Sequence, residues 1–530
     1  MNRFFIIFFL FFQFSLSFSF VSEFLDLPVD SLEYMIVREP EKYPLKISSL
    51  VACGVKNIDE FTNIIETFER SLSERADAKD GISFARLIFE EMHKNFIKSY
   101  GLYYDNIDVL LKKGNFNCLS STMLYSIFLE DFGYNFKAIT LPTHIFTLLY
   151  IDGREIDVEN TTPYGFDIRT NTEAQKIFKK LTGFDYTRET NKIEITDKKG
   201  ILASLYANLS ASDMRNKNYY SAFQNGIKAY SISPELRLVA SNTLAAYQGY
   251  IVFLRDRKEF KKALDISYEA VRFLPEKNAF TNTYLDVLDN YLSFVVKISN
   301  EDVAMNILKE EEKRMYIPSQ IRENLYINIY NKQTSGKINF DGLYNMLKKA
   351  LLELPNSSNI RGLLLNSFYL FIERSDADNE KEVLKWYELM KNDADMKKLL
   401  VNYYITTAHK YYKQKELDKG IEILERGRKN IASGEIDELR KDFYLLKGIE
   451  EIEKENYEAG KDYILIAKRI SPKDANVLKN LRLIYRIRVY DRIKKEDFKT
   501  AEVCLSEGLK EFPDDEKLLE YKKFLQSKKK

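Results

Sequence analysis

The chain after about residue 200 repeats itself at a spacing of 41 residues, and this restricts its fold more than any other feature. Beyond Ala203 the alternating patterns typical of strands disappear and helical spacing dominates. Small residues let paired helices approach closely, and proline ends a helix because it cannot continue the hydrogen-bond ladder. The pattern therefore predicts helical repeats over residues 200–530. The matching positions are Tyr206, Leu209, Ala222, Ala229 and Pro234 with Tyr247, Tyr250, Ala263, Ala270 and Pro275, and Tyr444, Gly448, Gly460, Ala467 and Pro472 with Tyr485, Val489, Ala501, Gly508 and Pro513.

These repeats resemble the tetratricopeptide pattern, with about six or seven units and lengthened helices. Residues 317–399 match it less clearly, although Ala350 and Pro355 fit. The resemblance implies an all-α solenoid with a concave surface that binds a protein or a peptide. A purely structural solenoid is the alternative.

Length and charge restrict the remaining possibilities. A chain of 530 residues is too long for one core, so at least two domains are expected. Its 80 basic and 79 acidic side chains nearly cancel. The overall charge therefore offers no electrostatic case for a nucleic-acid partner, and we expect none.

Residues 1–21 have the character of a secretory signal peptide. Arg3 precedes an apolar run from Phe4 to Phe12, and small serine residues follow. An uncleaved membrane anchor is the alternative. The less strictly apolar run that continues to Val21 approaches the length that spans a bilayer. Both interpretations predict an extracytoplasmic protein that is secreted, periplasmic or tethered to a membrane.

The inventory of reactive side chains is small, with three cysteines and three histidines. An odd and widely spread set of cysteines is not a disulfide framework. No Cys-x-x-Cys or His-x-x-x-His spacing occurs, so we expect no zinc site and no cofactor. One cysteine and one histidine nevertheless fall within the 48 residues from Gly114 to Thr161.

Residues 22–195 show a mixed pattern of helices and strands. Apolar spacing predicts helices near residues 31–37, 57–73, 82–98, 106–111 and 118–131. Strands are predicted over residues 136–141, 144–151 and 154–160, with Asp152-Gly153 as a hairpin turn. The stretch 22–50 carries three prolines and reads as a lead-in with one helix.

Cys118, His144 and the pair Asp157 and Glu159 form an ordered set with a chemical rationale. Cys118 opens a predicted helix, where free N–H groups and the helix dipole stabilise a thiolate. Asn115 and Asn117 precede it as candidate helix caps. An imidazole can accept the thiol proton, and a carboxylate can orient the imidazole. Asp157 and Glu159 lie two apart on a strand, so both point to one face, and either can serve.

The segment GNFNCLSSTMLYSIFLEDFGYNFKAITLPTHIFTLLYIDGREIDVENTTPYG resembles the core of transglutaminase-like proteins, a branch of the papain-like cysteine enzymes, and especially bacterial versions. The resemblance implies an α+β papain/transglutaminase-like fold over residues 22–195. It also implies Cys118 as the nucleophile, His144 as the base and Glu159 as the acidic residue, with Asp157 as the alternative. Two departures from the family pattern leave substrate preference open. Phe116 and Asn117 lengthen the usual Gly-Asn-Cys motif. Ile145 and Phe146 follow His144 where many members carry an aromatic pair or a tryptophan. The backbone N–H of Cys118 is an expected oxyanion donor, and Asn115 and Asn117 are candidate side-chain donors.

Two functions follow from these patterns. The first is an exported protein with a Cys-His-Glu site for amide hydrolysis or acyl transfer, joined to a helical array that binds a protein or peptide. Hydrolysis and transfer share one acyl-enzyme, so the residues do not choose between peptidase and transglutaminase-type chemistry. The second is a catalytically inactive transglutaminase-like domain in a protein-interaction scaffold.

Overall fold

A computed structural model describes residues 25–75, 80–183, 185–187, 193–274, 277–375 and 379–528. The chain divides into two compact units, one up to Tyr291 and one from Leu292, and each is described by itself. The predicted signal peptide lies outside the described residues. Within the described ranges, no helix has both the length and the apolar character needed to cross a membrane.

The first unit opens with a group of short helices. They are α2 (Leu32–Arg38), η1 (Pro40–Lys42), α3 (Leu45–Ala52), α4 (Ile58–Ser73), α5 (Gly81–Asn95) and α6 (Ile107–Lys113). Four of them match predicted helices, whereas α3 lies in the stretch expected to be a lead-in with a single helix. That expectation was wrong because Pro44 sits directly before the first helical residue, where a missing N–H breaks no helical hydrogen bond.

A four-stranded antiparallel sheet forms the centre of the first unit. Its strands are β3 (Asn135–Leu141), β4 (His144–Ile151), β5 (Arg154–Val158) and β6 (Glu194–Thr196), in the order β5-β4-β3-β6. The predicted hairpin turn at Asp152-Gly153 is present, and both residues have positive φ. Strand β6 was not predicted, and it has only three residues.

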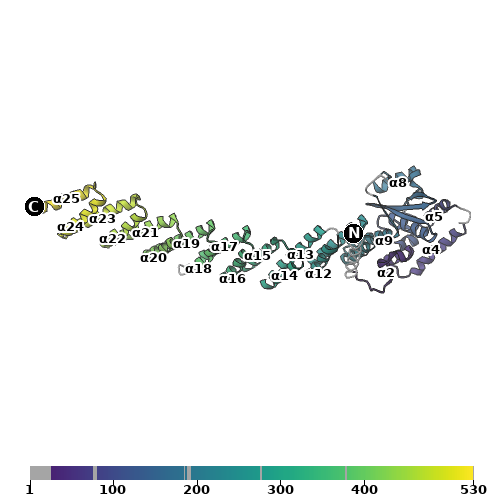
Figure 1. Cartoon of the computed structure of the whole chain (residues 1–530), viewed down its shortest axis with the longest axis horizontal. Coiled ribbons are helices and arrows are strands. Elements are labelled where there is room, and N and C mark those ends of the chain that lie inside the picture. The colour runs from purple at the N-terminus through teal and green to yellow at the C-terminus, as the bar shows by residue number, and fades with distance from the viewer. Residues whose placement is uncertain are drawn as a thin grey trace, which may run out of the picture. The chain divides into compact units, whose positions relative to one another are not determined.

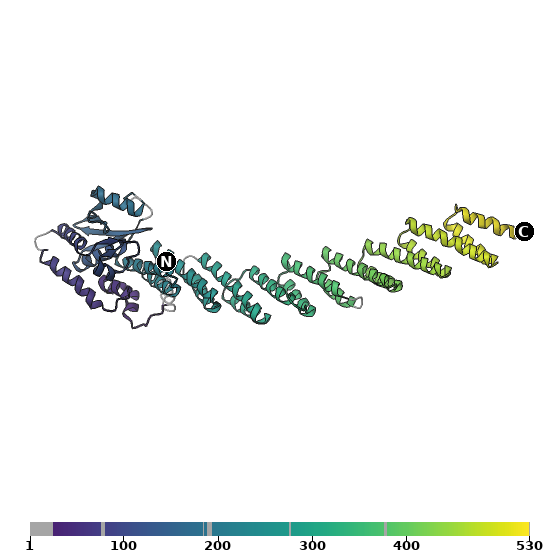
Figure 2. The same cartoon turned by 180° about the vertical axis from the view of Figure 1, so that it is seen from behind.

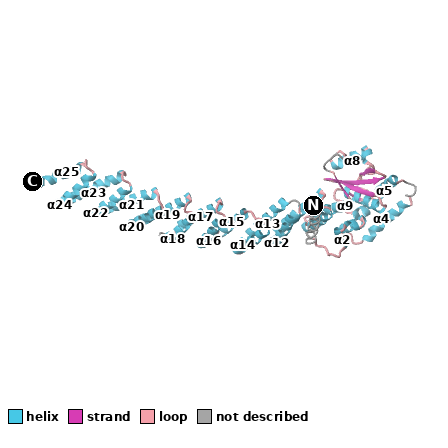
Figure 3. Ribbon diagram, in the orientation of Figure 1, coloured by secondary structure: helices cyan, strands magenta, loops and turns pink. Residues whose placement is uncertain are grey.

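Helices cover both faces of this sheet (Figures 1 and 2). Helix α7 (Cys118–Asp131) packs against β3 and β4 and is buried almost throughout. Helix α8 (Thr172–Thr182) covers the opposite face, where Phe146, Leu148 and Phe178 belong to one apolar cluster. Figure 3 shows that the long strands lie together in this part of the chain. Strands β1 (Ser99–Tyr100) and β2 (Asn115–Phe116) form a short parallel pair, and β2 lies just before α7 in the chain.

Helix α9 (Lys198–Arg215) belongs to two packing environments. It contacts β3, β6 and α7 as well as the following helices α10 (Tyr219–Ile232) and α11 (Arg237–Asp256). Helix α12 (Phe260–Phe273) completes the repeats of the first unit, and α10 and α12 begin 41 residues apart. Because α9 packs on both the sheet and the repeats, the predicted domain boundary between residues 195 and 200 stays a prediction.

The second unit consists of helical repeats, and α13 (Lys277–Ile298) crosses the boundary between the units. Helices α22 and α24 begin at Tyr457 and Phe498, which confirms the predicted spacing of 41 residues. Described helix pairs run from α9/α10 to α23/α24, more than the six or seven predicted, because the middle region pairs its helices without the motif. The further helices are α14 (Glu301–Arg314), α15 (Ser319–Thr334), α16 (Phe340–Glu353), α17 (Ser358–Arg374), α18 (Glu380–Glu388), α19 (Ala394–Lys413), α20 (Leu417–Asn430), α21 (Gly434–Glu453), α22 (Tyr457–Ile470), α23 (Ala475–Lys494), α24 (Phe498–Glu511) and α25 (Glu516–Lys528).

Two of the predicted small residues, Gly448 and Gly460, face each other where α21 crosses α22. A Cβ on Gly448 would lie 3.0 Å from the Gly460 carbonyl oxygen and 2.6 Å from Ile464 Cγ1. A Cβ on Gly460 would lie 3.0 Å from the Gly448 carbonyl oxygen. The two backbones therefore approach more closely than any larger residue allows.

We expect Gly448→Ala to lower the free energy of unfolding by about 1–3 kcal/mol, because the new methyl group forces α21 and α22 apart. Gly362 on α17 is the matched control, since a Cβ there meets nothing within 4 Å. Gly362→Ala should raise the stability by up to about 1 kcal/mol through helix propensity. Urea unfolding followed by circular dichroism measures both. An unfolding midpoint of Gly448→Ala at or above the wild-type value would contradict this account.

Candidate functional site

Cys118 is the first residue of α7, and the preceding segment determines where that helix begins. Helix α6 ends at Gly114, whose φ of 76° lies in the left-handed region that glycine tolerates. Strand β2 follows and pairs with β1, so the chain enters α7 from an extended segment. Cys118 is half-buried, whereas most of the helix behind it is buried.

Asn117 is the cap of α7, as one of the two predicted candidates. Its Oδ1 accepts a hydrogen bond from the Ser120 N–H (2.9 Å), and the Ser120 hydroxyl accepts one from the Asn117 N–H (3.0 Å). This reciprocal capping box satisfies two N–H groups at the start of the helix. The Asn117 amide Nδ2 donates to Asp105 Oδ1 (2.7 Å). Asn117 is therefore committed to structure, and its amide is not directed at an oxyanion.

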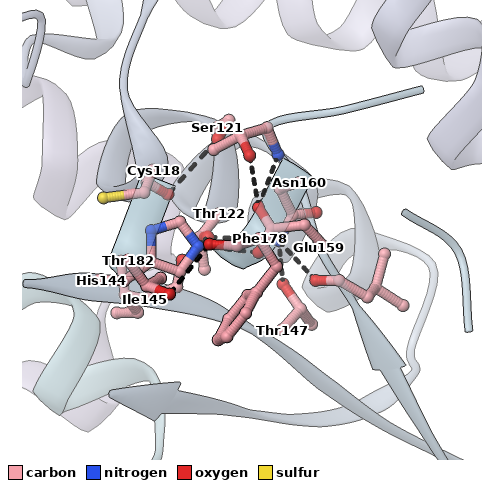
Figure 4. Close-up of polar contacts among 12 residues, drawn as sticks. Cys118, Ser121, Thr122, His144, Ile145, Thr147, Glu159, Asn160, Phe178 and Thr182 are labelled. Atoms are coloured by element: carbon pink, nitrogen blue, oxygen red, sulfur yellow. Dashed lines mark hydrogen bonds and ion pairs between the residues drawn. The ribbon is translucent and has the colours of Figure 1, made fainter. Parts of the chain in front are cut away.

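His144 opens β4 and lies close to Cys118 (Figure 4). Its ring packs edge-on against Phe178 of α8, with centroids 5.5 Å apart. Its Nε2 lies 2.7 Å from Glu159 Oε2, and both side chains are buried. Figure 4 shows the Cys118 side chain beside the ring, on the side away from Glu159. The imidazole therefore lies between the thiol and a carboxylate.

Glu159 follows the end of β5 and is held by its own neighbours. Its Oε1 accepts hydrogen bonds from the Thr161 N–H (3.0 Å) and the Thr161 hydroxyl (2.5 Å). Its backbone N–H donates to the Gly165 carbonyl oxygen (3.0 Å). A Cβ on Gly165 would lie 1.8 Å from the Glu159 carbonyl oxygen, so the close approach of these two backbones requires glycine.

Asp157, the alternative acidic residue, has a different partner. Its carboxylate accepts a hydrogen bond from the Tyr186 hydroxyl beyond α8. Tyr186 packs against Phe146 and Phe178 on the same face of the sheet. Of the two candidates, Glu159 is the one whose carboxylate lies 2.7 Å from His144.

Burial and charge act in opposite directions on this pair. Burial lowers the pKa of His144, but the Glu159 charge and the hydrogen bonds with Cys118 and Glu159 outweigh it and raise that pKa to about 10. Burial raises the pKa of Glu159, but the charge and hydrogen bond of His144 and the bonds from Thr161 bring it below its usual value. The geometry therefore favours an imidazolium paired with a carboxylate.

Asn160 anchors the segment that carries Glu159, and it was not among the predicted site residues. Its Nδ2 donates to Thr147 Oγ1 of β4 (2.8 Å) and to Thr122 Oγ1 of α7 (3.1 Å). Asn160 thus ties Glu159 to both the strand of His144 and the helix of Cys118. In the sequence, Asn160 stands directly after Glu159. It was predicted to be the last residue of the strand over residues 154–160, and its position alone did not indicate these contacts.

His93 of α5 lies close to this segment and is not exposed at the surface. It is buried and packs against Phe89 with ring centroids 4.5 Å apart. Burial lowers its pKa to about 4, although the Glu159 charge and a hydrogen bond to the Asn160 backbone act the other way. His93 is therefore neutral at physiological pH and adds no competing charge beside Glu159.

Metal ligands do not gather at any place in the part of the chain that the structure describes. No group of three or more His, Cys, Asp or Glu side chains there is arranged to hold a metal ion. The remaining cysteines differ from Cys118 in their surroundings. Burial raises the pKa of the Cys53 thiol to about 12, and burial also raises that of Cys504.

No protein-family model and no curated protein matches this chain. Among solved structures, it is 13% identical to a human IFIT1 dimer with PPP-AAAA, over 96% of this chain and 99% of that chain, at a TM-score of 0.18. It is 12% identical to Naa15/Naa10 bound to HypK-THB, over 57% of each chain, at a TM-score of 0.13. It is 13% identical to the APC/C hetero-tetramer Cut9-Hcn1, over 65% of this chain and 76% of that chain, at a TM-score of 0.13. At TM-scores this low, the similarity establishes neither a family nor a shared fold.

We expect the stability of the protein to depend on pH through this pair. The His144 pKa is raised from 6.5 to about 10, so its contribution is fully present below pH 6.5 and is lost as the pH rises to about 10. The Glu159 pKa is lowered from 4.5, so its contribution is present above pH 4.5 and is lost as the pH falls below that value. Glu159→Gln should lower stability at pH 6 and reduce the further loss between pH 6 and pH 9.5.

Urea unfolding midpoints at pH 6 and pH 9.5 measure this difference. Glu173→Gln is the matched control, since Glu173 is an exposed residue of α8 that pairs with Lys176 at the surface. It should follow the wild-type pH dependence. If Glu159→Gln lost as much stability as the wild type between the two pH values, the charge coupling to His144 would be refuted.

Proposed function

We propose that this protein uses Cys118, His144 and Glu159 for thiol-dependent amide hydrolysis or acyl transfer within a transglutaminase-like domain. One observation carries the proposal. A half-buried thiol at a helix N-terminus lies beside a buried imidazole whose far nitrogen is 2.7 Å from a carboxylate. That order of groups is the one that thiol nucleophiles require. The motif that resembles transglutaminase-like proteins supports the same assignment of roles.

Cys118 and His144 carry out the proposed reaction in two steps, acylation and deacylation. The Cys118 thiolate attacks the carbonyl carbon of an amide, and the His144 imidazolium gives its proton to the departing amine as the C–N bond breaks. A thioester remains on Cys118, and His144 is now neutral. His144 then takes a proton from water or from an acceptor amine as that nucleophile attacks the thioester. The C–S bond breaks, and the thiolate and imidazolium are restored. Glu159 keeps the ring oriented and stabilises its positive charge throughout.

The helical repeats are the proposed binding part of the protein, and they are tetratricopeptide-like in their pattern of aromatic and small residues. A pocket in the second unit supports a role in recognition. It lies between the starts of α16 and α18 and is lined by the aromatic side chains Phe340, Phe371 and Trp386 with the charged Lys385 and Glu382. Such mixed aromatic and charged linings suit peptide segments. The proposed partner is therefore a protein or peptide. The near balance of 80 basic and 79 acidic side chains gives no electrostatic support for a nucleic-acid partner.

Export to an extracytoplasmic compartment is part of the proposal and rests on residues 1–21. We expect the mature protein to begin near residue 22 when it is produced in a secreting host. Intact-mass spectrometry of the purified protein measures this directly. A full-length mass in the membrane fraction would instead favour the uncleaved anchor.

The nucleophile can be tested through its rate of alkylation. We expect iodoacetamide to label Cys118 at least about tenfold faster than free cysteine at pH 6, because a neighbouring imidazolium favours the thiolate. His144→Ala should return the rate to that of free cysteine. Peptide mass spectrometry after timed quenching gives the rate at each cysteine, with Cys53 and Cys504 as slow internal references.

His409→Ala is the matched control, because His409 is an exposed histidine of α19 in the second unit. It should leave the labelling rate of Cys118 unchanged. If Cys118 of the wild type reacted no faster than free cysteine, the enzymatic proposal would fail. The second function, a catalytically inactive domain in an interaction scaffold, would then hold.

A further inference from the structure

Next to Cys118 lies an unusual surface, the loop from Tyr100 to Asp105, here called the aromatic loop. Leu102 and Tyr103 are 70% and 66% exposed, and Tyr100 and Tyr104 are also exposed. Four large apolar side chains within five residues therefore face solvent. Exposed apolar side chains scattered singly are ordinary, but a contiguous group indicates a binding surface.

The backbone of the aromatic loop is attached to the start of the Cys118 helix. The Gly101 N–H donates to the Phe116 carbonyl oxygen (2.9 Å). Asn117 Nδ2 donates to the Leu102 carbonyl oxygen (3.3 Å), and the Ser120 hydroxyl donates to the Tyr104 carbonyl oxygen (2.7 Å). Since three backbone groups face the segment from Phe116 to Ser120, the loop is held beside the nucleophile while its side chains remain exposed.

Helix α9 supports the loop from the other side. Asp105 accepts a hydrogen bond from Asn208 Nδ2 (2.7 Å) as well as from Asn117. The Arg215 guanidinium lies over the Tyr103 ring, 4.2 Å from its centroid. These contacts order the loop before any ligand binds, so a ligand does not bear the entropy of ordering it.

Tyr100 connects the loop to the reacting groups. Its ring packs against Phe116 with centroids 5.6 Å apart, two residues before Cys118. Tyr100 is only 36% exposed, and this partial burial raises its pKa to about 12, with the charges of Cys118 and Glu159 contributing to the increase. The charges of Cys118 and Glu159 therefore reach the Tyr100 hydroxyl, and the exposed Leu102 and Tyr103 follow Tyr100 closely in the chain.

We propose that the aromatic loop binds the acyl-donor side of a polypeptide substrate and selects an aromatic or branched aliphatic side chain beside the reacting carbonyl. This inference rests on the proposed function, because it names the substrate class of the same site. An apolar side chain gains free energy when it covers Leu102 and Tyr103. A carboxylate in that position loses hydration against Leu102, and the Arg215 guanidinium is already held over the Tyr103 ring, so we expect a carboxylate to be disfavoured.

Two covalent probes test the selection. Acetyl-phenylalanyl chloromethyl ketone and acetyl-aspartyl chloromethyl ketone each lose chloride as the Cys118 thiolate forms a C–S bond at the methylene. Each rate is divided by the rate of the same probe with N-acetylcysteine. We expect the phenylalanyl probe to label Cys118 at least about tenfold faster than the aspartyl probe after this correction.

Variants of the loop assign the preference to it. Replacing both exposed side chains, Leu102→Ser with Tyr103→Ser, should bring the ratio of the two rates close to one. Leu102→Lys should shift the ratio toward the aspartyl probe, because it adds a cation beside the acyl donor. Tyr316→Ser is the matched control, since Tyr316 is 82% exposed in the second unit, and its ratio should equal that of the wild type. Circular dichroism checks that each variant is folded.

The outcomes separate this inference from the proposed function. Fast labelling by iodoacetamide together with a wild-type probe ratio near one would overturn the inference and leave the proposed function intact. A wild-type preference that persists in both loop variants would also overturn it. Iodoacetamide labelling no faster than that of free cysteine would remove the proposed function, and the inference with it.

Discussion

The buried pair of His144 and Glu159 is the interaction on which the arrangement of the first unit depends. Two charges buried without compensation would cost several kcal/mol, and removal of one partner from such a pair typically costs about 3–5 kcal/mol. The structure compensates by satisfying both carboxylate oxygens, one with His144 Nε2 and one with Thr161. This requires the β4–β5 hairpin to bring residues 144 and 159 together. It also requires the Gly165 backbone to lie against Glu159. The buried charges of His144 and Glu159 are therefore compensated by three features together. These are the β4–β5 hairpin, the segment after it and the packing of α8.

A second buried carboxylate, that of Asp105, lies where the site joins the first repeats. Asp105 accepts hydrogen bonds from Asn117, which caps the Cys118 helix, and from Asn208 on α9. Helix α9 also packs against the sheet and against α10 and α11. Helix α9 thus packs against the sheet of the first unit and is also the first helix of the repeats. The buried Asp105 carboxylate links the start of the Cys118 helix to α9, so the position of the thiol depends on the packing of α9.

Periodic segments were predicted well, and irregular ones were not. The helix of Cys118 and the strand of His144 begin at the predicted residues, because a cap and a run of β-branched residues are local signals. Helix α3 was missed because Pro44 was read as an interruption, although it stands at the position before the helix where proline fits. The repeats with an aromatic residue, small residues and proline were found at their correct spacing. The helices between residues 317 and 399 pair without that motif, and their number was therefore underestimated.

The sequence by itself determined the candidate thiol and imidazole, the helix and hairpin that carry them, and the helical character of the chain after residue 200. These depend on residues close together in the chain, where caps, turns and periodicity act. The choice between Asp157 and Glu159 depended on the tertiary structure. Two acidic residues two apart look alike in the sequence. One contacts Tyr186, which lies beyond α8, and the other contacts His144, fifteen residues earlier. The roles of Asn160 and of the aromatic loop likewise arise only from contacts between distant segments, because hydrogen bonds across the fold leave no periodic trace in the chain.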